Sequence, residues 1–301
     1  MKAAPKALAT ALAAFTALGT LAVSAAPASA VRTKDCGKSA AIALEAVALT
    51  KAGQLLCVDV AHPGTARLLG KAGPLDAGTK LVDIDIRPET GRLYGLGSNG
   101  ALYTLSLKNA VATKVANGLK KWDDATAFAL SGHSFGMNFN PAVDRLRVVS
   151  DTGMNIRINP ADGVTYVDSP LANTVPGGAA TGVTGLAYTN NDPKAVADTN
   201  SSMFAVDTAY DRMQFANTPN SGQLVPTGPL GRNVDADNGF DIYTTLAGGK
   251  ARTNTAFAAF SNGTRSTLYT VDLFGGGLTK LGAFAKKRGE IIGLTLPLNQ
   301  R

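Results

Sequence analysis

Two aspartates stand at equivalent positions of a segment that recurs along the chain, and this pairing suggests chemistry on sugars. The equivalent residues are Asp85, Asn138, Ala187, Asp241 and Thr295. Two carboxylates that flank a glycosidic bond can act as an acid and as a base or nucleophile. Asp85 and Asp241 are therefore the candidate catalytic residues of a glycan-acting hydrolase, provided that they face each other and open to solvent.

This row is polar, whereas a row inside packed β-structure is ordinarily apolar. Buried carboxylates and amides are unfavourable unless they are paired, so we predict that Asp85, Asn138 and Asp241 line a wet central channel. The binding residues expected near its ends are Asp83, Arg87 and Asn140. The alternative is that these side chains hydrogen-bond to neighbouring strands and water and hold the fold together.

A long loop at residues 118–134 carries the only tryptophan, Trp122. Long loops in an otherwise tight fold are often functional. Trp122 lies beside Asp123 and Asp124 and is a candidate to stack on a sugar or another planar group, with ordinary packing as the alternative. Residues 121–129 are also the one segment whose pattern favours a short turn of helix.

Three arginines gather in one repeat. Arg145 and Arg147 lie on one face of a predicted strand, and Arg157 follows on its hairpin partner. Charge pairs between strands are one explanation, and an anion pocket is the other. The acids near them in sequence are Asp144, Asp151 and Asp162.

Oxygen ligands alternate around a glycine at Asp235, Asp237 and Asp241, as they do in calcium loops. The segment lacks the spacing and the closing glutamate of an EF-hand, so Ca²⁺ is a possible cofactor and a hydrogen-bonded turn the alternative. His62 and His133 are the only histidines and belong to different loops, which disfavours metals that prefer nitrogen. No Ser-His-Asp or Cys-His set is positioned for nucleophilic hydrolysis.

The recurring segment defines a repeat, because positions 85, 138, 187, 241 and 295 are separated by 53, 49, 54 and 54 residues. In each copy small or polar residues alternate with large apolar ones, and this period of two indicates strands. Asn-Gly at 99–100 and 262–263 lies between alternating segments and favours hairpins. Four glycines begin the copies and are expected to relieve crowding where strands converge: Gly136, Gly185, Gly239 and Gly293.

Four short strands in about 50 residues is the spacing of a propeller blade. The last copy, 291–296, is a first strand with nothing after it, and the predicted strands 44–49, 54–60 and 65–69 have no first strand before them. Joining the two closes a ring without free sheet edges. We therefore predict an all-β, five-bladed β-propeller closed by pairing of the C-terminal strand with the N-terminal blade. A six-bladed ring and a β-sandwich are the alternatives.

The first 30 residues have the order of a cleavable secretory signal: two lysines, an Ala/Leu-rich stretch and Ala28-Ser29-Ala30. A membrane anchor is the alternative, but no later segment reaches the ~20 apolar residues of a span. We expect residues 31–301 to form a single propeller domain, periplasmic or extracellular.

Removing Lys2 and Lys6 lowers the formal charge from +7 to +5. The basic residues are dispersed, which disfavours nucleic-acid binding.

Both cysteines, Cys36 and Cys57, remain after cleavage. In an oxidising compartment an even pair is a candidate disulfide. It would tie the N-terminal segment to the predicted strand 54–60, and two separate buried thiols are the alternative.

Several runs resemble one exported bacterial family, known as domain of unknown function 4394. They include RPETGRLYGLGSNGALYTL, FGMNFNPAVDRLRVVSDTGMNIRINPADG, GVTGLAYTNND, FAVDTAYDRM and VDADNGFDIY. The resemblance covers nearly all of the mature chain and implies the fold and export. It carries no assigned activity.

Three functions follow for an exported propeller. We favour a non-catalytic binding or scaffold protein whose partner is a small molecule, a glycan or an envelope protein. A glycan-acting hydrolase using Asp85 and Asp241 is the alternative, and a purely structural role is the third.

Overall fold

The computed structural model describes Cys36 and residues 44–191, 200–216, 218–247 and 250–298. The predicted signal peptide, residues 1–30, lies outside the described residues. Contacts divide the chain into Met1–Thr33 and Lys34–Arg301, and the second unit contains every element named below. No helix in the described part is long and apolar enough to cross a membrane.

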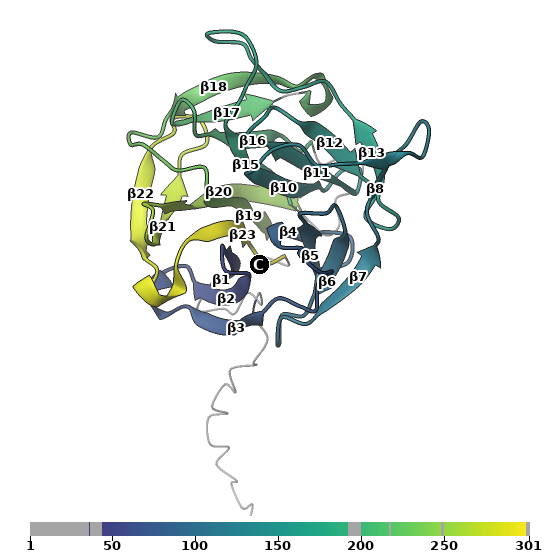
Figure 1. Cartoon of the computed structure of the whole chain (residues 1–301). Coiled ribbons are helices and arrows are strands. Elements are labelled where there is room, and N and C mark those ends of the chain that lie inside the picture. Colours follow the sequence, from purple (N-terminus) through teal and green to yellow (C-terminus); the bar gives the residue numbers. More distant parts are fainter. Residues whose placement is uncertain (1–35, 37–43, 192–199, 217, 248–249, 299–301) are drawn as a thin grey trace, which may run out of the picture. The chain divides into compact units, whose positions relative to one another are not determined.

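Five sheets, here called blades 1 to 5, surround a common axis (Figure 1). Blade 1 consists of β23 (Ile291–Thr295), β1 (Glu45–Thr50), β2 (Gln54–Asp59) and β3 (Arg67–Lys71). Blade 2 consists of β4 (Leu81–Arg87), β5 (Arg92–Gly97), β6 (Leu102–Leu105) and β7 (Ala112–Ala116). Blade 3 consists of β10 (Phe135–Asn140), β11 (Arg145–Ser150), β12 (Asn155–Ile158), β13 (Val164–Val167), β8 (Leu119–Lys121) and β9 (Ala127–Phe128).

Blade 4 consists of β15 (Val183–Tyr188), β16 (Met203–Asp207), β17 (Arg212–Ala216), β18 (Gln223–Pro229) and β14 (Ala172–Asn173). Blade 5 consists of β19 (Asn238–Ala247), β20 (Lys250–Ser261), β21 (Ser266–Val271) and β22 (Leu278–Ala283). Three short 3-10 turns complete the elements: η1 (Pro63–Thr65), η2 (Pro219–Ser221) and η3 (Lys286–Arg288).

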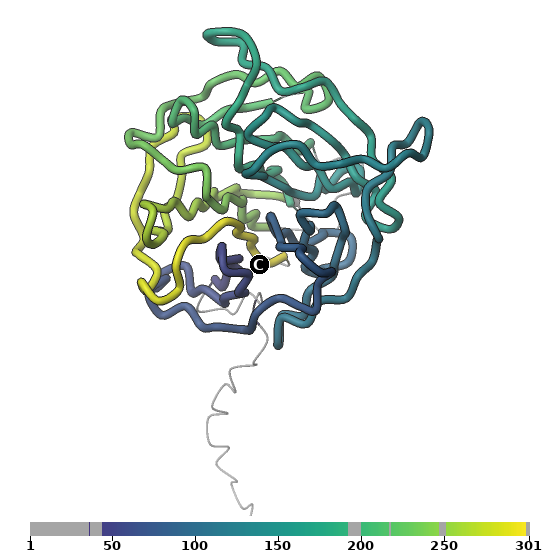
Figure 2. Tube along the Cα trace, viewed as in Figure 1, coloured from purple at the N-terminus to yellow at the C-terminus, as the bar shows by residue number. Residues whose placement is uncertain are grey.

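The ring closes as the sequence predicts. Strand β23 pairs with β1, with Val47 opposite Thr295, and Figure 2 shows the yellow C-terminal tube beside the purple N-terminal strands. The innermost strand of each blade contacts the innermost strand of the next, in the order β4, β10, β15, β19, β23 and back to β4. The five-bladed propeller and its closure by the C-terminal strand are therefore confirmed.

One local prediction is wrong. Residues 121–129 are not helical: β8 ends at Lys121, and β9 (Ala127–Phe128) returns beside it. Strand β8 also pairs in parallel with β13, where Lys121 lies opposite Thr165. These partners satisfy the backbone in an extended form, so tertiary pairing overrides the local helical pattern.

An apolar cluster fills each interface between neighbouring blades. The clusters follow from the alternation in each strand, because successive side chains point to opposite faces of a sheet and both faces are covered by neighbours. The interface between blades 3 and 4 differs from the others. Of the strands of blade 3, only β11 contributes to its apolar cluster, through Val149.

The glycines that begin the inner strands allow these strands to approach one another. A Cβ on Gly136 would lie 2.8 Å from the Cα of Gly185, and one on Gly239 would lie 2.7 Å from the carbonyl carbon of Gly293. Such contacts are too short for any side chain. The prediction that these glycines relieve crowding around the axis is confirmed for these positions.

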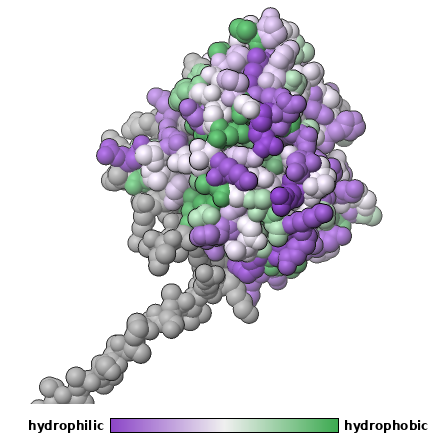
Figure 3. Space-filling model, turned by 90° about the vertical axis from the view of Figure 1, so that its left-hand side faces the viewer, coloured by the Kyte–Doolittle hydropathy of each residue, from purple (hydrophilic) through white to green (hydrophobic). Residues whose placement is uncertain are grey.

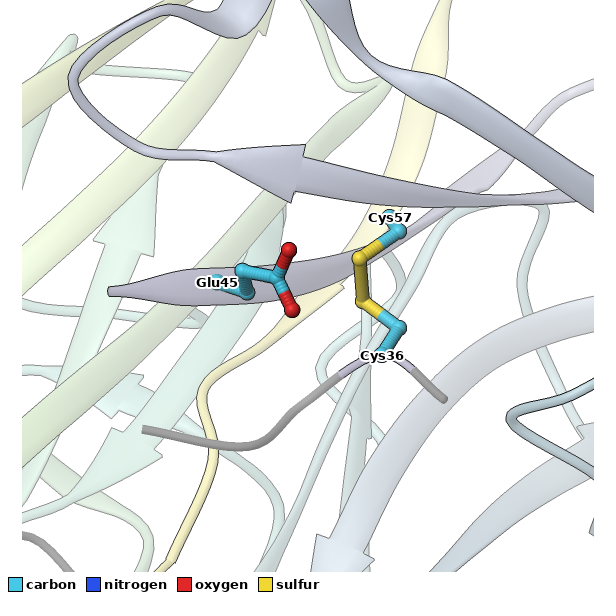
Figure 4. Close-up of side chains that lie close together, drawn as sticks. All are labelled: Cys36, Glu45 and Cys57. Atoms are coloured by element: carbon cyan, nitrogen blue, oxygen red, sulfur yellow. A yellow bond between two sulfur atoms is a disulfide. The ribbon is translucent and has the colours of Figure 1, made fainter. Parts of the chain in front are cut away.

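Cys36 and Cys57 form the predicted disulfide, with their Cα atoms 5.4 Å apart (Figure 4). The bond joins the N-terminal segment to β2. The face shown in Figure 3 mixes hydrophilic residues with smaller groups of hydrophobic ones, as is usual for protein surfaces.

Candidate functional site

Side chains of the predicted polar row join the inner strands at the axis. In four of the five steps around the ring, the row residue accepts a hydrogen bond from the amide just after the row position of the next strand. The four bonds are Phe139 N to Asp85 Oδ2 (2.7 Å), Tyr188 N to Asn138 Oδ1 (3.1 Å), Leu296 N to Asp241 Oδ2 (2.6 Å) and Ile86 N to Thr295 Oγ1 (3.1 Å). The row therefore fastens each blade to its neighbour.

The one remaining step, from Ala187 to Asp241, and the position of Asp83 two residues before the row show why aspartates occur at the axis. Ala187 has no side-chain acceptor, and the following aspartate, Asp241, accepts from its own neighbour Ile242 N at 2.8 Å. Asp83 follows Gly293 around the ring in the same way: its Oδ1 accepts from Ile84 N and its Oδ2 from Met137 N, both at 2.8 Å. A carboxylate has the two oxygens that this double task requires.

These side chains contact protein rather than solvent. Asp85 and Asn138 are 1% exposed, and Asp241 is 0% exposed. Asp85 also accepts from the Thr295 hydroxyl at 2.8 Å, and Asp241 from Asn138 Nδ2 at 3.1 Å. The structure thus brings the predicted row together in the arrangement of the structural alternative. It does not place Asp85 and Asp241 on a solvent-open channel.

Burial raises the pKa of all three axial carboxyls. The pKa of Asp83 lies well above its usual range because the group is removed from water. The same cause, followed by repulsion from Asp241, raises the pKa of Asp85. Burial raises the pKa of Asp241 to about 7, although two backbone amides and Asn138 donate to it and act in the opposite direction. Among the described residues, no lysine, arginine or histidine forms an ion pair with these carboxyls.

The other residues predicted near the channel are separated from it by their partners. Arg87 forms an ion pair with Asp144 of the next blade, with Nε 2.7 Å from Oδ1, and donates to the Tyr94 hydroxyl at 3.3 Å. Asn140 accepts from Ala142 N at 2.9 Å and lines a pocket on blade 3.

The predicted calcium ligands have separate partners. Asp237 pairs with Lys51 Nζ at 2.5 Å, Asp241 lies at the axis and Asp235 is exposed. In the described part of the chain, one group of three potential metal ligands lies within 4.8 Å: Cys36, Glu45 and Cys57 (Figure 4). Its two sulfurs are joined in the disulfide and are not thiolate ligands. Calcium binding stays a prediction.

A second polar row crosses blade 3 from the axis to the rim. Asn138 lies opposite Arg147, Arg147 opposite Arg157, and Arg157 opposite Tyr166 in the strand register. Residues in register project from the same face of a sheet. The indole ring of Trp122 extends this row, since it stacks on Tyr166 with ring centres 5.5 Å apart. Exposure rises along the row: the side chain of Arg147 is 1% exposed and that of Arg157 27%, and Trp122 is 63% exposed.

Arg147 links blade 3 to blade 4. Its guanidinium donates to the Tyr188 hydroxyl at 2.7 Å, to Asp168 Oδ2 at 3.0 Å and to Asn220 Oδ1 at 2.5 Å, and it also bonds Asn155. A buried arginine is tolerated when its charge and its donors are satisfied in this way. Arg147 is thus a positioning residue that holds η2 of blade 4 against blade 3.

A pocket of about 680 Å³ opens beside η2 at the outer end of this row. It is lined by Asn140, Val143, Arg145, Arg157, Tyr166, Thr218, Pro219 and Asn220. Arg157 donates two hydrogen bonds of 2.8 Å to Asp168, from Nε to Oδ2 and from Nη2 to Oδ1. Its Cζ lies 5.3 Å from the ring centre of Tyr166. We call the lining residues, together with Trp122, the blade-3 site.

The sequence singled out four members of this site, Trp122, Asn140, Arg145 and Arg157. The acids nearest to the arginines in sequence, however, form no side-chain ion pair with Arg145, Arg147 or Arg157. Asp144 pairs with Arg87, whereas Asp151 accepts from His133 N and Asp162 from Val164 N. The partner of Arg147 and Arg157 is Asp168, in the loop after β13. Tyr166 and Asn220 were missed. The strand alternation around residues 164–167 could have placed Tyr166 opposite Arg157.

The other blades provide an internal comparison for Arg147. At the position paired with the row residue of the innermost strand, they carry Val47, Tyr94, Phe204 and Phe257. All four are buried within apolar clusters or against them. A propeller blade is therefore built without a charge at this position, and the arginine row distinguishes blade 3.

The profile of a family described as domain of unknown function (DUF4394) matches residues 54–295. The chain belongs to this family. The resemblance in the repeat motifs is thus confirmed, and the DUF4394 match covers blades 2 to 5 and all of blade 1 except β1. A search of curated proteins finds no match.

Solved structures similar to this DUF4394 chain share little sequence with it. A protein of unknown function from Bacteroides thetaiotaomicron is 14% identical with a TM-score of 0.41, covering 82% of this chain and 60% of that one. The computationally designed Ika8 protein is 11% identical with a TM-score of 0.34 (82% and 63%). The glutaminyl cyclase of Myxococcus xanthus is 11% identical with a TM-score of 0.36 (85% and 95%). The chain thus spans less than two thirds of the length of the first two, and nothing about function follows from these likenesses.

Proposed function

We propose that this DUF4394 propeller is an exported, non-catalytic binding protein whose ligand occupies the blade-3 site. The observation that carries the proposal is the polar row of blade 3. It leads from a buried Arg147, which donates four hydrogen bonds, to a pocket with two arginines and Tyr166, on which the exposed Trp122 stacks. Stability alone does not require such a row, since the other blades pack apolar side chains at the position of Arg147.

The pocket has the character of a small-ligand site. Its volume of about 680 Å³ lies within the roughly 300–1,000 Å³ of such sites. Its polar groups are held by the fold: Arg157 by Asp168, and Asn220 by Arg147. A ligand would therefore meet donors whose positions are already fixed, which lowers the entropy lost on binding.

The hydrolase alternative finds less support at the axis. A general acid or nucleophile must touch its substrate, whereas Asp85 and Asp241 are 1% and 0% exposed. The oxygens of both carboxylates accept hydrogen bonds from other inner strands, and Asp241 also accepts one from Ile242 N of its own strand. These bonds account for the two residues without any catalytic role.

Export is part of the proposal. The order of residues 1–30 is that of a secretory signal, and the Cys36–Cys57 disulfide fits an oxidising compartment, because disulfides persist outside the reducing cytosol.

A thermal-shift screen of the purified protein with glycans, nucleotides and small anions tests the proposal. A ligand of the folded state must raise the melting temperature. We expect at least one compound to do so, to be recovered chemically unchanged, and to lose its effect in Arg145→Gln but not in Arg265→Gln. Arg265 is an exposed arginine of blade 5 and serves as the matched control. Turnover of a compound by the wild type that Asp85→Asn abolishes would overturn the proposal in favour of the hydrolase.

A further inference from the structure

The blade-3 site carries more positive than negative charge. Arg147 and Arg157 share a single carboxylate, Asp168. Arg145 forms no ion pair with any described carboxylate, and its neighbour Asp144 is engaged by Arg87. The two arginines that line the pocket, Arg145 and Arg157, and the buried Arg147 behind them thus have one paired carboxylate among them, so positive charge is in excess around the pocket.

The two arginines that line the pocket retain unused donors. Arg157 gives Nε and Nη2 to Asp168, and its Nη1 has no hydrogen-bond partner among the described residues. Arg145 uses Nη1 on the backbone carbonyls of Val143 and Asp144, at 3.5 and 3.1 Å, while its Nε and Nη2 have no described partner. Guanidinium donors of this kind bind carboxylates and related oxyanions most strongly.

An aromatic surface adjoins these donors. Tyr166 lines the pocket, and Trp122 stacks on it with an angle of 27° between the ring planes. Trp122 is 63% exposed and therefore packs little against the rest of the blade. An exposed, prearranged indole suits the flat apolar face of a sugar ring, whose hydroxyl groups meet the amides of Asn140 and Asn220 at the pocket wall.

We propose that the ligand of the blade-3 site is an acidic saccharide, with its carboxylate between Arg145 and Arg157 and a sugar ring against Trp122. This inference rests on the proposed function and specifies its ligand. The excess positive charge favours an acidic ligand over a neutral one, and the aromatic pair favours a saccharide over a simple inorganic anion. Arg147 positions Asn220 and does not touch the ligand.

Isothermal titration calorimetry with three tetrasaccharides tests this specificity. The probes are tetragalacturonate, its full methyl ester, which has the same rings without the charge, and a sulfated tetrasaccharide. The acid is expected to bind at least about tenfold more tightly than the ester, with an affinity that falls as salt is raised. Stronger binding of the sulfated probe than of the acid would overturn the carboxylate assignment.

Variants locate the binding. Arg145→Gln should weaken the acid about tenfold and leave the ester unchanged, whereas Trp122→Ala should weaken both about fivefold. Arg265→Gln should change neither. Equal affinities of wild type for acid and ester overturn the acidic ligand but leave the pocket as the binding site. Saccharide binding that neither Arg145→Gln nor Trp122→Ala alters overturns both the inference and the proposed function, and a lack of binding by all three probes overturns the inference.

Discussion

The axis and the blade-3 site are both polar regions inside an apolar fold, and they handle charge in opposite ways. At the axis, three carboxyls lie near one another without a cationic ion-pair partner among the described residues, and backbone amides satisfy their oxygens. On blade 3, two arginines share Asp168, and the row ends at a pocket with unused donors. The oxygens of the axial carboxyls all have protein donors, whereas Arg145 and Arg157 keep donors without a partner among the described residues.

This difference lets us distinguish polar residues that hold the ring together, at the axis, from those that we propose to bind a ligand, on blade 3. The axial side chains repeat with the blades, one step per inner strand, as expected of groups that hold a ring together. The arginine row occurs in blade 3, and the position of Arg147 is apolar or aromatic in the other blades. In a repeat protein, a departure from the pattern of the repeat marks a candidate site more clearly than a polar residue that follows it.

The largest effect is expected from removing the carboxylate of the blade-3 row. Asp168→Ala leaves Arg147 buried without its counter-charge and should lower the free energy of unfolding by about 3–5 kcal/mol. Urea denaturation followed by circular dichroism measures the change. Asp123→Ala, an exposed acid of the same blade, is the control. Equal losses in the two variants would contradict the charge-compensation argument.

At the axis, removing the hydrogen-bond acceptor of Asp85 should destabilise the fold more than removing only its charge. Asp85→Ala leaves Phe139 N and the Thr295 hydroxyl buried without an acceptor, and should lower the free energy of unfolding by about 2–4 kcal/mol. Asp85→Asn keeps one acceptor oxygen and relieves repulsion from Asp241, so its loss should be smaller. The same denaturation experiment ranks the two, and a reversed order would refute the fastening role.

The buried carboxyl of Asp241 should make the stability of the protein depend on pH. Burial raises the pKa of Asp241 from 3.8 to about 7, so the folded protein holds a proton that the unfolded chain releases. The stabilisation is complete below the ordinary carboxyl pKa and is lost as the pH rises through about 7. The melting temperature should therefore fall between about pH 4 and pH 7 and level off above that. Asp241→Asn should flatten this decline, and an unchanged slope in that variant would count against the raised pKa.

The smallest effects on stability should come from Arg145 and Trp122 of the blade-3 site. Trp122→Ala removes an exposed side chain, and Arg145→Gln changes a half-buried one whose described hydrogen bonds go to backbone carbonyls, so each should change the free energy of unfolding by no more than about 0.5 kcal/mol. Losses as large as that of Asp168→Ala would assign these side chains to the fold instead of to a ligand. The measurement is again urea denaturation.

The sequence by itself determined the architecture, because its signals are local and repeated. Alternation with a period of two, turns such as Asn99-Gly100 and a spacing of about 50 residues define the blades. The unpaired first strand at the C-terminus and the incomplete blade at the N-terminus require each other, and two cysteines allow one pairing. The one local error, the helix at 121–129, arose where pairing of β8 with β13 outweighed the pattern.

Only the tertiary structure decided which polar residues meet and which of them face solvent. Asn220 reaches Arg147 across 73 residues of sequence, and Asp241 reaches Asn138 across 103. Such partners depend on how separate blades pack, and no local pattern records that packing. For the same reason the row predicted to line a channel lies buried. Of the arginines predicted either to pair or to bind an anion, Arg147 and Arg157 pair with Asp168, and Arg145 lines the pocket without an ion pair among the described residues.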